Sequence, residues 1–157
     1  MKNKTTLNII LFISIAALGC AYFIEYILSY KPCNLCLIER LPYFLVIIII
    51  LLGLFLNRFE KFILIFLSLI FVSATILSIY HVGIEQGFIK ESLVCFSNEE
   101  IDNLNKEDLI KELQKEVISC KDVQFTFFGL SLATINAIIS LLLSVITFRL
   151  FLNYEKN

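Results

Sequence analysis

Four long apolar stretches dominate the chain, and each is close to the length that carries an α-helix across a membrane. About 20 helical residues cross the roughly 30 Å of hydrocarbon in a bilayer. The second stretch is continuously apolar only after Arg40, so it reaches spanning length only if its helix begins near Leu35. We therefore expect an all-α membrane protein, a bundle of four transmembrane helices at residues 7–28, 35–56, 62–80 and 125–152.

The composition supports this fold class and argues against others. Hydrophobic residues make up 59% of the 157 residues and charged residues 17%, whereas soluble domains average about 45–50% apolar and about 25% charged residues. The formal charge of -1 argues against a nucleic-acid-binding protein, because such proteins carry a basic surface. The sequence also has no Gly-rich phosphate loop and no G-x-S-x-G motif.

The connections between the stretches predict an up-down order within one membrane domain, residues 1–157. The link at Asn57–Lys61 is so short that the second and third spans must be antiparallel neighbours. Both termini then lie on the side of this turn, and two outer loops, residues 29–40 and 81–124, lie on the other side. Basic residues flanking the termini and the turn favour a cytoplasmic position for them, with the outer loops on the oxidising side.

Two segments allow a second interpretation. Residues 2–20 resemble a lipoprotein signal ending at Cys20, but the apolar run continues beyond it, so we expect an uncleaved first span with Cys20 buried in packing. The segment Asn105–Ser119 has apolar residues at helical spacing after a capping pattern, which predicts a short amphipathic helix in the second outer loop. This helix either lies solvated over the bundle mouth or rests on the membrane surface.

The sequence KPCNLC places two cysteines, Cys33 and Cys36, where the first outer loop meets the second span. Their spacing allows a disulfide. The N-terminal end of a helix stabilises a thiolate, and Arg40 follows Cys36 by one helical turn, so it can reach the same face. A redox-active pair is our main interpretation. The alternatives are an inert disulfide and half of a four-cysteine zinc site.

The other two loop cysteines, Cys95 and Cys120, lie near the ends of the second outer loop. A disulfide between them would lie on an exposed, flexible loop that a soluble protein thiol can reach. The chain has one histidine, no dinucleotide fingerprint and no haem or iron–sulfur motif. A lipid-soluble quinone is therefore the expected electron acceptor, and Arg40 and His81, at outer ends of spans, are the candidates to stabilise charge on its headgroup.

Two segments resemble a known family. KPCNLCLIER, residues 31–40, resembles the Pro-Cys-x-x-Cys-x-x-Glu-Arg signature of the disulfide bond formation protein B (DsbB) family, and YHVGIEQGF, residues 80–88, resembles its segment after the third span. The order of spans and cysteines fits over essentially the whole chain. The resemblance implies a quinone-dependent protein thiol:disulfide oxidoreductase of the bacterial inner membrane, using ubiquinone or menaquinone. It also implies a periplasmic, thioredoxin-like dithiol oxidase (DsbA-like) as the partner.

The resemblance further implies roles for individual residues. The partner attacks the Cys95–Cys120 disulfide at Cys95, and exchange with the CxxC pair moves the electron pair to the membrane edge. Cys36 is then the thiolate that engages the quinone, and Cys33 completes the pair. The resemblance assigns Arg40 and His81 to the quinone site. It adds Glu39 and Glu85 as further candidates.

Two other functions stay open on the sequence alone. A reductase would run the same exchange in the opposite direction, because the sequence contains no information on reduction potentials. A metal-binding or structural membrane protein would use the outer-loop cysteines as ligands or staples, and its function would not depend on quinone.

Overall fold

The computed structural model describes residues 4–56, 60–90, 95, 119–121, 123 and 125–155. The predicted amphipathic helix at Asn105–Ser119 lies outside the described residues, apart from Ser119 itself. The elements, in chain order, are α1 (Lys4–Tyr26), α2 (Asn34–Ile38), α3 (Leu41–Leu56), α4 (Glu60–Glu85), β1 (Thr126–Phe127), β2 (Leu130–Ser131) and α6 (Leu132–Glu155). The two strands pair antiparallel as a short hairpin.

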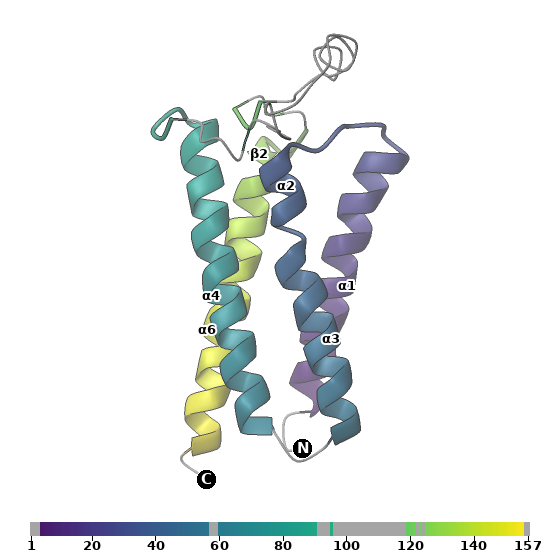
Figure 1. The fold of residues 1–157 in the computed structure, drawn as a ribbon, viewed down its shortest axis with the longest axis vertical. Coiled ribbons are helices and arrows are strands. Elements are labelled where there is room, and N and C mark those ends of the chain that lie inside the picture. The colour runs from purple at the N-terminus through teal and green to yellow at the C-terminus, as the bar shows by residue number, and fades with distance from the viewer. Residues whose placement is uncertain are drawn as a thin grey trace, which may run out of the picture.

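The helices lie side by side as an up-down-up-down bundle (Figure 1). α1 packs on α3, α3 packs on α4, and α4 packs most extensively on α6. The N and C termini lie at one end of the bundle, while α2 and the hairpin lie at the other (Figure 1). Within the described residues, four helical segments are long and apolar enough to cross a membrane: Lys4–Tyr26, Asn34–Leu54, Lys61–Glu85 and Leu132–Tyr154. The predicted four-helix bundle is confirmed.

The second span is broken between α2 and α3, which the sequence analysis did not predict. Pro42 has no N–H to bond the carbonyl of Ile38, and its ring crowds that carbonyl. The chain tightens at the break, where the Arg40 N–H donates to the Leu37 carbonyl at 3.2 Å. Glu39 and Arg40 therefore lie between two helical segments, at the end of the bundle that carries the cysteines.

α4 is longer than the predicted third span. It continues to Glu85, whereas the sequence analysis ends this span at Tyr80, so His81 lies in the helix and not in the outer loop. The helix ends before Gly87, whose N–H donates to the Ile84 carbonyl at 3.0 Å. The φ of Gly87 is 77°, a left-handed value that glycine commonly adopts after a helix C-terminus.

α6 begins later than the predicted fourth span, because the residues before it form the hairpin. The hairpin turn is Phe128–Gly129, with φ values of 52° and 81°. Left-handed values at both central residues are typical of two-residue hairpin turns. Ser131 ends the hairpin and starts the helix, since its hydroxyl accepts a hydrogen bond from the Thr134 N–H at 3.2 Å, as an N-cap does.

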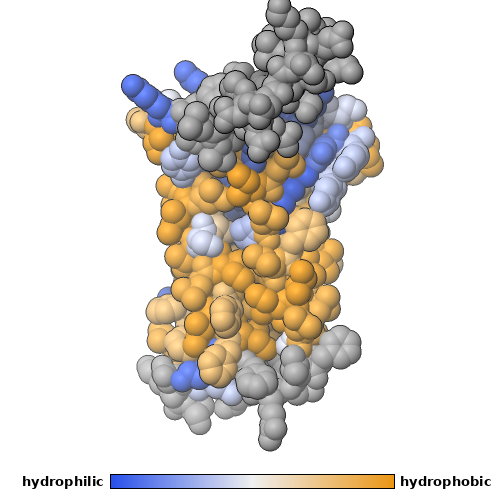
Figure 2. Space-filling view, in the orientation of Figure 1, coloured by the Kyte–Doolittle hydropathy of each residue, from blue (hydrophilic) through white to orange (hydrophobic). Residues whose placement is uncertain are grey.

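Large apolar side chains cover the outside of the bundle. Phe12, Phe66 and Ile76, on α1 and α4, are each more than half exposed. Figure 2 shows a hydrophobic belt over the middle of the visible face, with hydrophilic residues gathered toward the end that carries α2. An apolar surface of this extent suits lipid rather than water, and the helices satisfy their own backbone groups as lipid requires. The chain is a multi-pass membrane protein.

Buried residues form two clusters along the bundle axis. The first fills the space between the long helices and includes Phe71 and Leu67. The second lies at the α2 end of the bundle, and its members are Cys33, Leu35, Ile84, Cys95 and Cys120.

Candidate functional site

Cys33 starts helix α2 and holds its own sulfur against the helix N-terminus. It is the N-cap residue, with extended backbone angles, and its Sγ accepts a hydrogen bond from the Cys36 N–H at 3.2 Å. Only 6% of Cys33 is exposed. Cys33 and Cys36 are both free thiols, so the structure shows the reduced form of the pair that the sequence analysis expects to cycle through a disulfide.

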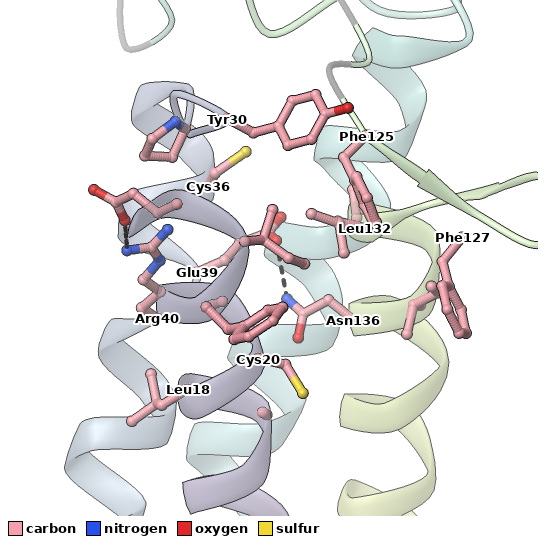
Figure 3. A pocket seen from close by; sticks show the side chains of 18 of the residues that line it. Leu18, Cys20, Tyr30, Cys36, Glu39, Arg40, Phe125, Phe127, Leu132 and Asn136 are labelled. Carbon is pink, nitrogen blue, oxygen red and sulfur yellow. Dashed lines mark hydrogen bonds and ion pairs between the residues drawn. The ribbon is translucent and has the colours of Figure 1, made fainter. Parts of the chain in front are cut away.

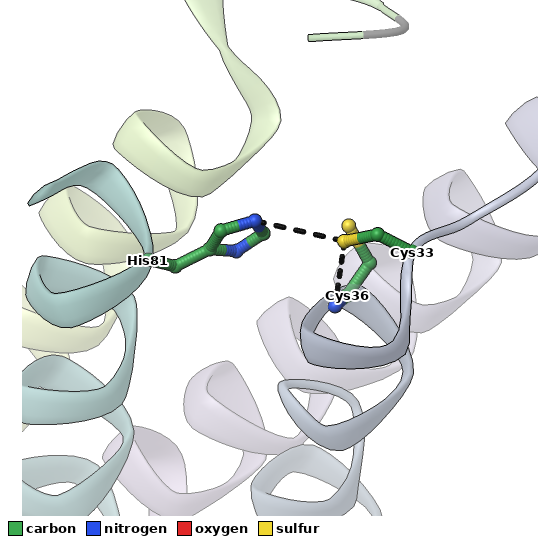
Figure 4. Close-up of side chains that lie close together, drawn as sticks. All are labelled: Cys33, Cys36 and His81. Carbon is green, nitrogen blue, oxygen red and sulfur yellow. Dashed lines mark hydrogen bonds between the residues drawn. The ribbon is translucent and has the colours of Figure 1, made fainter. Parts of the chain in front are cut away.

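His81 on α4 faces this pair. Its Nε2 lies 3.6 Å from Cys33 Sγ (Figure 4). Its Nδ1 lies 2.9 Å from Glu39 Oε1, and both side chains are almost completely buried. The carboxylate fixes the ring so that Nδ1 carries a proton and Nε2 faces the sulfur. The structure thus brings together Cys33, His81 and Glu39 from separate parts of the sequence.

The surroundings of Cys33 stabilise its thiolate. They lower its pKa to about 5, first through the hydrogen bond from the Cys36 thiol. Burial opposes this shift, and contacts with His81 and the Cys36 N–H strengthen it. The resemblance led us to expect Cys36 as the thiolate that engages the quinone, and this stays a prediction. The geometry adds that Cys33 is the stabilised thiolate in the described structure, because the helix N-terminus and the imidazole both face its sulfur.

A hydrogen-bonded network holds Glu39 at Oε2, the carboxylate oxygen that does not contact His81. Asn136 on α6 donates its Nδ2 to Glu39 Oε2 at 2.9 Å and to Ser78 Oγ at 2.8 Å. Tyr43 donates its hydroxyl to Asn136 Oδ1 at 2.5 Å. The sequence analysis did not identify Asn136, Tyr43 or Ser78. The detectable signal was a lone amide within an apolar span, since polar residues inside a membrane usually face the bundle interior and have partners.

Glu85 lies on the other side of His81, one turn further along α4. Its Oε1 lies 3.9 Å from His81 Nε2. Ser131 donates its hydroxyl to Glu85 Oε2 at 2.5 Å. The serine that caps α6 therefore also fixes this carboxylate beside the imidazole.

Arg40 points toward α1. Its guanidinium forms an ion pair with Glu25, and both side chains are largely buried. The same group lies over the Tyr22 ring, 5.0 Å from the centroid. Figure 3 shows Arg40 at the side of a pocket toward which Cys36 also points. The sequence analysis predicted that Arg40 reaches the face of Cys36. In the structure Arg40 pairs with Glu25 instead, and it shares with Cys36 only the lining of the same cavity.

The second cysteine pair is a disulfide, Cys95–Cys120, with a Cα–Cα distance of 5.6 Å. The sequence analysis expected this disulfide to be exposed, and that was wrong. Cys95 and Cys120 are 1% and 2% exposed, because they pack with Cys33, Leu35 and Ile84 in one cluster. Apolar contact with the end of the bundle removes the disulfide from solvent and brings it to the CxxC motif.

A cavity of about 710 Å³ opens beside this cluster, with walls from α1, the first outer loop, α2 and α6. Its polar end includes Cys36, Arg40, His81 and Glu85, while Cys120 also reaches its surface. The rest of the wall is mostly apolar and extends down the facing sides of α1 and α6 (Figure 3). Drug-sized ligands bind in cavities of about 300–1,000 Å³ of this character.

Cys20 lines the same cavity further down α1 (Figure 3). The sequence analysis expected it to be a buried packing residue, and this was wrong, because Cys20 is exposed.

Comparison with known proteins agrees with the four-helix membrane fold. The family model described as Disulfide bond formation protein DsbB matches residues 3–150. The chain belongs to the DsbB family. A Rickettsia prowazekii (strain Madrid E) protein, called uncharacterized protein RP370, is 35% identical over 154 residues, which cover 96% of this chain and 89% of the relative. No solved structure matches the chain.

Membership of the DsbB family gives the site its chemical class. The family acts in disulfide bond formation, which implies a thiol oxidoreductase activity for this membrane protein. The four-cysteine version of the zinc alternative is wrong in this structure, because Cys95 and Cys120 are bonded to each other.

Proposed function

We propose that this DsbB-family protein oxidises a thioredoxin-like dithiol partner and transfers the electron pair to a membrane quinone. The observation that carries the proposal is the shared cluster in which Cys33 packs with the Cys95–Cys120 disulfide at the polar end of an apolar cavity. Disulfide exchange needs the two cysteine pairs to meet, and a quinone needs an apolar path from the bilayer. Both requirements converge on this end of the bundle.

The first exchange takes place at the loop disulfide. A partner thiolate attacks Cys95, the partner sulfur bonds to Cys95 Sγ, and Cys120 leaves as a thiolate that takes up a proton. The second partner thiol then displaces Cys95, which leaves the partner as a disulfide and Cys95 and Cys120 as two thiols. Because the disulfide is buried in the described structure, Cys95 must become more exposed before the partner thiolate can attack it.

The second exchange moves the electron pair to the membrane edge. One thiolate of the loop pair attacks the Cys33–Cys36 disulfide, and its partner cysteine then resolves the mixed disulfide. The products are a Cys95–Cys120 disulfide and two thiols at Cys33 and Cys36, which is the redox arrangement of the structure. The Cys36 N–H and His81 stabilise Cys33 as the leaving thiolate.

The cavity fits a quinone. Arg40 and His81 at its polar end would hold the headgroup, and the apolar sides of α1 and α6 would contact the tail. A bound quinone supplies an acceptor for two electrons and two protons. Cys36 lines the cavity and presents the sulfur that meets the headgroup, while Cys33 closes the disulfide. The His81 imidazole, oriented by Glu39, takes and passes on the thiol proton.

The proposed location follows from charge and chemistry. The bundle end with the termini carries Lys4 and Arg149 near its helix ends and faces the cytoplasm, in line with the positive-inside rule. The cysteine end then faces the periplasm, where disulfides persist and the dithiol partner would act. These features support a location in the bacterial inner membrane.

The test uses purified full-length protein in lipid nanodiscs, with dithiothreitol as the electron donor and a short-chain ubiquinone analogue as the acceptor. We expect quinone reduction by the wild-type protein, an unchanged rate in Cys20→Ser, and loss of at least 99% of the rate in Cys36→Ser. Equal rates in Cys36→Ser and Cys20→Ser would contradict the proposal, because both variants remove one cavity thiol and only one of them belongs to the CxxC motif.

A further inference from the structure

The reduced CxxC pair and His81 have the arrangement of a metal site. The sulfur atoms of Cys33 and Cys36 and a ring nitrogen of His81 all lie within 4.8 Å of one another. They come from two elements, the start of α2 and the last turns of α4, so the tertiary fold and not the motif alone assembles them (Figure 4). Two thiolates and an imidazole form a donor set that zinc prefers.

The distance between the donor atoms of α2 and α4, Cys33 Sγ and His81 Nε2, suits tetrahedral zinc. Zinc binds thiolate sulfur at about 2.3 Å and imidazole nitrogen at about 2.0 Å, which at a tetrahedral angle puts the two donor atoms about 3.5 Å apart. Cys33 Sγ and His81 Nε2 are 3.6 Å apart. An ion can therefore enter between these atoms without a shift of α2 relative to α4, and Cys36 closes the third position by a side-chain rotation.

The groups around the donors are also those of a metal site. His81 uses its Nδ1 on the Glu39 carboxylate and leaves Nε2 for the ion, which is the carboxylate–histidine–metal arrangement found behind most histidine ligands. The Cys36 N–H already donates to Cys33 Sγ, which supports a thiolate there. Glu85 Oε1 lies 3.9 Å from His81 Nε2, so a second carboxylate stands near the three donors, and a water can complete the four ligands of zinc.

We propose that the reduced protein binds one zinc ion through Cys33 Sγ, Cys36 Sγ and His81 Nε2, with Glu39 as the positioning carboxylate and a water as the fourth ligand. The site exists only in the dithiol form, because a Cys33–Cys36 disulfide has no thiolate to offer. Binding releases the thiol protons and involves no electron transfer. If the oxidase function holds, zinc would arrest the cycle by preventing the two sulfurs from bonding.

The first test is zinc protection of the wild-type chain. Full-length protein in nanodiscs is reduced, freed of reductant under argon, and alkylated with a maleimide with and without one equivalent of Zn²⁺. We expect Zn²⁺ to slow labelling of Cys33 and Cys36 at least tenfold, whereas Cys20, the internal control on α1, is labelled equally in both samples. Equal labelling of Cys33 and Cys36 with and without Zn²⁺ would overturn the proposal.

The second test identifies the histidine, with Co²⁺ as a spectroscopic probe. We expect thiolate-to-cobalt charge-transfer absorption at one Co²⁺ per reduced chain, none in the oxidised chain, and competition by Zn²⁺. Glu39→Gln should weaken binding about 10- to 100-fold, the usual cost of losing the carboxylate behind a histidine ligand. An unchanged Co²⁺ affinity and spectrum in His81→Ala would exclude His81 and overturn the site. Neither test uses quinone, so their failure would leave the oxidase proposal untouched.

Discussion

At the scale of single residues, the two cysteines of the CxxC motif have different surroundings. Cys33 lies buried at the helix N-terminus against His81, while Cys36 is only partly buried, and both residues line the cavity. A thiol with a low pKa leaves more readily in disulfide exchange, so in the exchange with the loop pair Cys33 suits the leaving sulfur and Cys36 the sulfur that is attacked. Cys36 then suits the step at the cavity.

The pKa of Cys33 gives a prediction at this scale. The pKa is lowered to about 5 in the folded protein, against about 8.5 for an unperturbed cysteine. Above the unperturbed value the thiolate interactions contribute fully to the stability of the reduced protein, and they are lost as the pH falls through about 5. The alkylation rate of Cys33 in the reduced protein should therefore have its midpoint near pH 5 and fall below it. In His81→Gln, which removes one stabilising contact, this midpoint should move upward.

The measurement is iodoacetamide labelling across a pH series, resolved by peptide mass spectrometry. Cys20 on α1 reports the reaction of a thiol outside the network in the same sample. A midpoint for Cys33 that is the same in wild type and His81→Gln would show that the imidazole does not act on this sulfur.

At the scale of elements, one amide on α6 ties the site to the bundle. Asn136 bonds Glu39 in the break between α2 and α3, Ser78 on α4 and Tyr43 on α3. In the part of the chain that the structure describes, no buried side-chain nitrogen or oxygen lacks a partner. The position of His81 therefore depends on a helix that supplies no catalytic group.

Asn136→Leu should destabilise the protein, although it replaces a polar residue with an apolar one inside a membrane span. It removes the hydrogen-bond partner of Glu39 Oε2 and that of the Tyr43 hydroxyl, and each lost partner costs about 1–3 kcal/mol. Thermal unfolding in detergent should shift to clearly lower temperature. Ser140→Ala, one turn along α6, removes only bonds to the helix's own carbonyls and is the matched control. Equal unfolding temperatures for the two variants would contradict this role of the network.

The ion pair between α1 and the α2–α3 break holds Arg40 at the cavity, so we expect its loss to weaken quinone binding. Arg40 lies on the cavity wall, held by Glu25 and the Tyr22 ring. A charge-assisted hydrogen bond contributes about 1.5–3 kcal/mol, so Arg40→Ala should raise the KM for a ubiquinone analogue about 10- to 100-fold. Arg149→Ala, near the opposite end of the bundle, should leave the KM unchanged. Steady-state kinetics that give the same KM for both variants would remove Arg40 from the quinone site.

At the scale of the whole molecule, the sequence predicted the bundle and the motif but not their contacts. Apolar length alone predicts the four spans, and KPCNLC predicts a thiol pair at a helix start. Burial of Cys95–Cys120 could not be predicted, because it depends on packing between an outer loop and the bundle end. The break before α3 was predictable from Pro42, while the links from His81 to Glu39 and Asn136 depend on three-dimensional geometry.

The central claim is that electrons pass from the loop pair through the CxxC pair to a membrane quinone. The most direct test is a thiol count by maleimide mass shift in acid-quenched membranes from respiring cells, repeated after quinone depletion. We predict one free thiol, Cys20, in respiring membranes, and three after depletion, when Cys33 and Cys36 accumulate as thiols. The same count with and without quinone, or four to five free thiols in respiring membranes, would contradict the account.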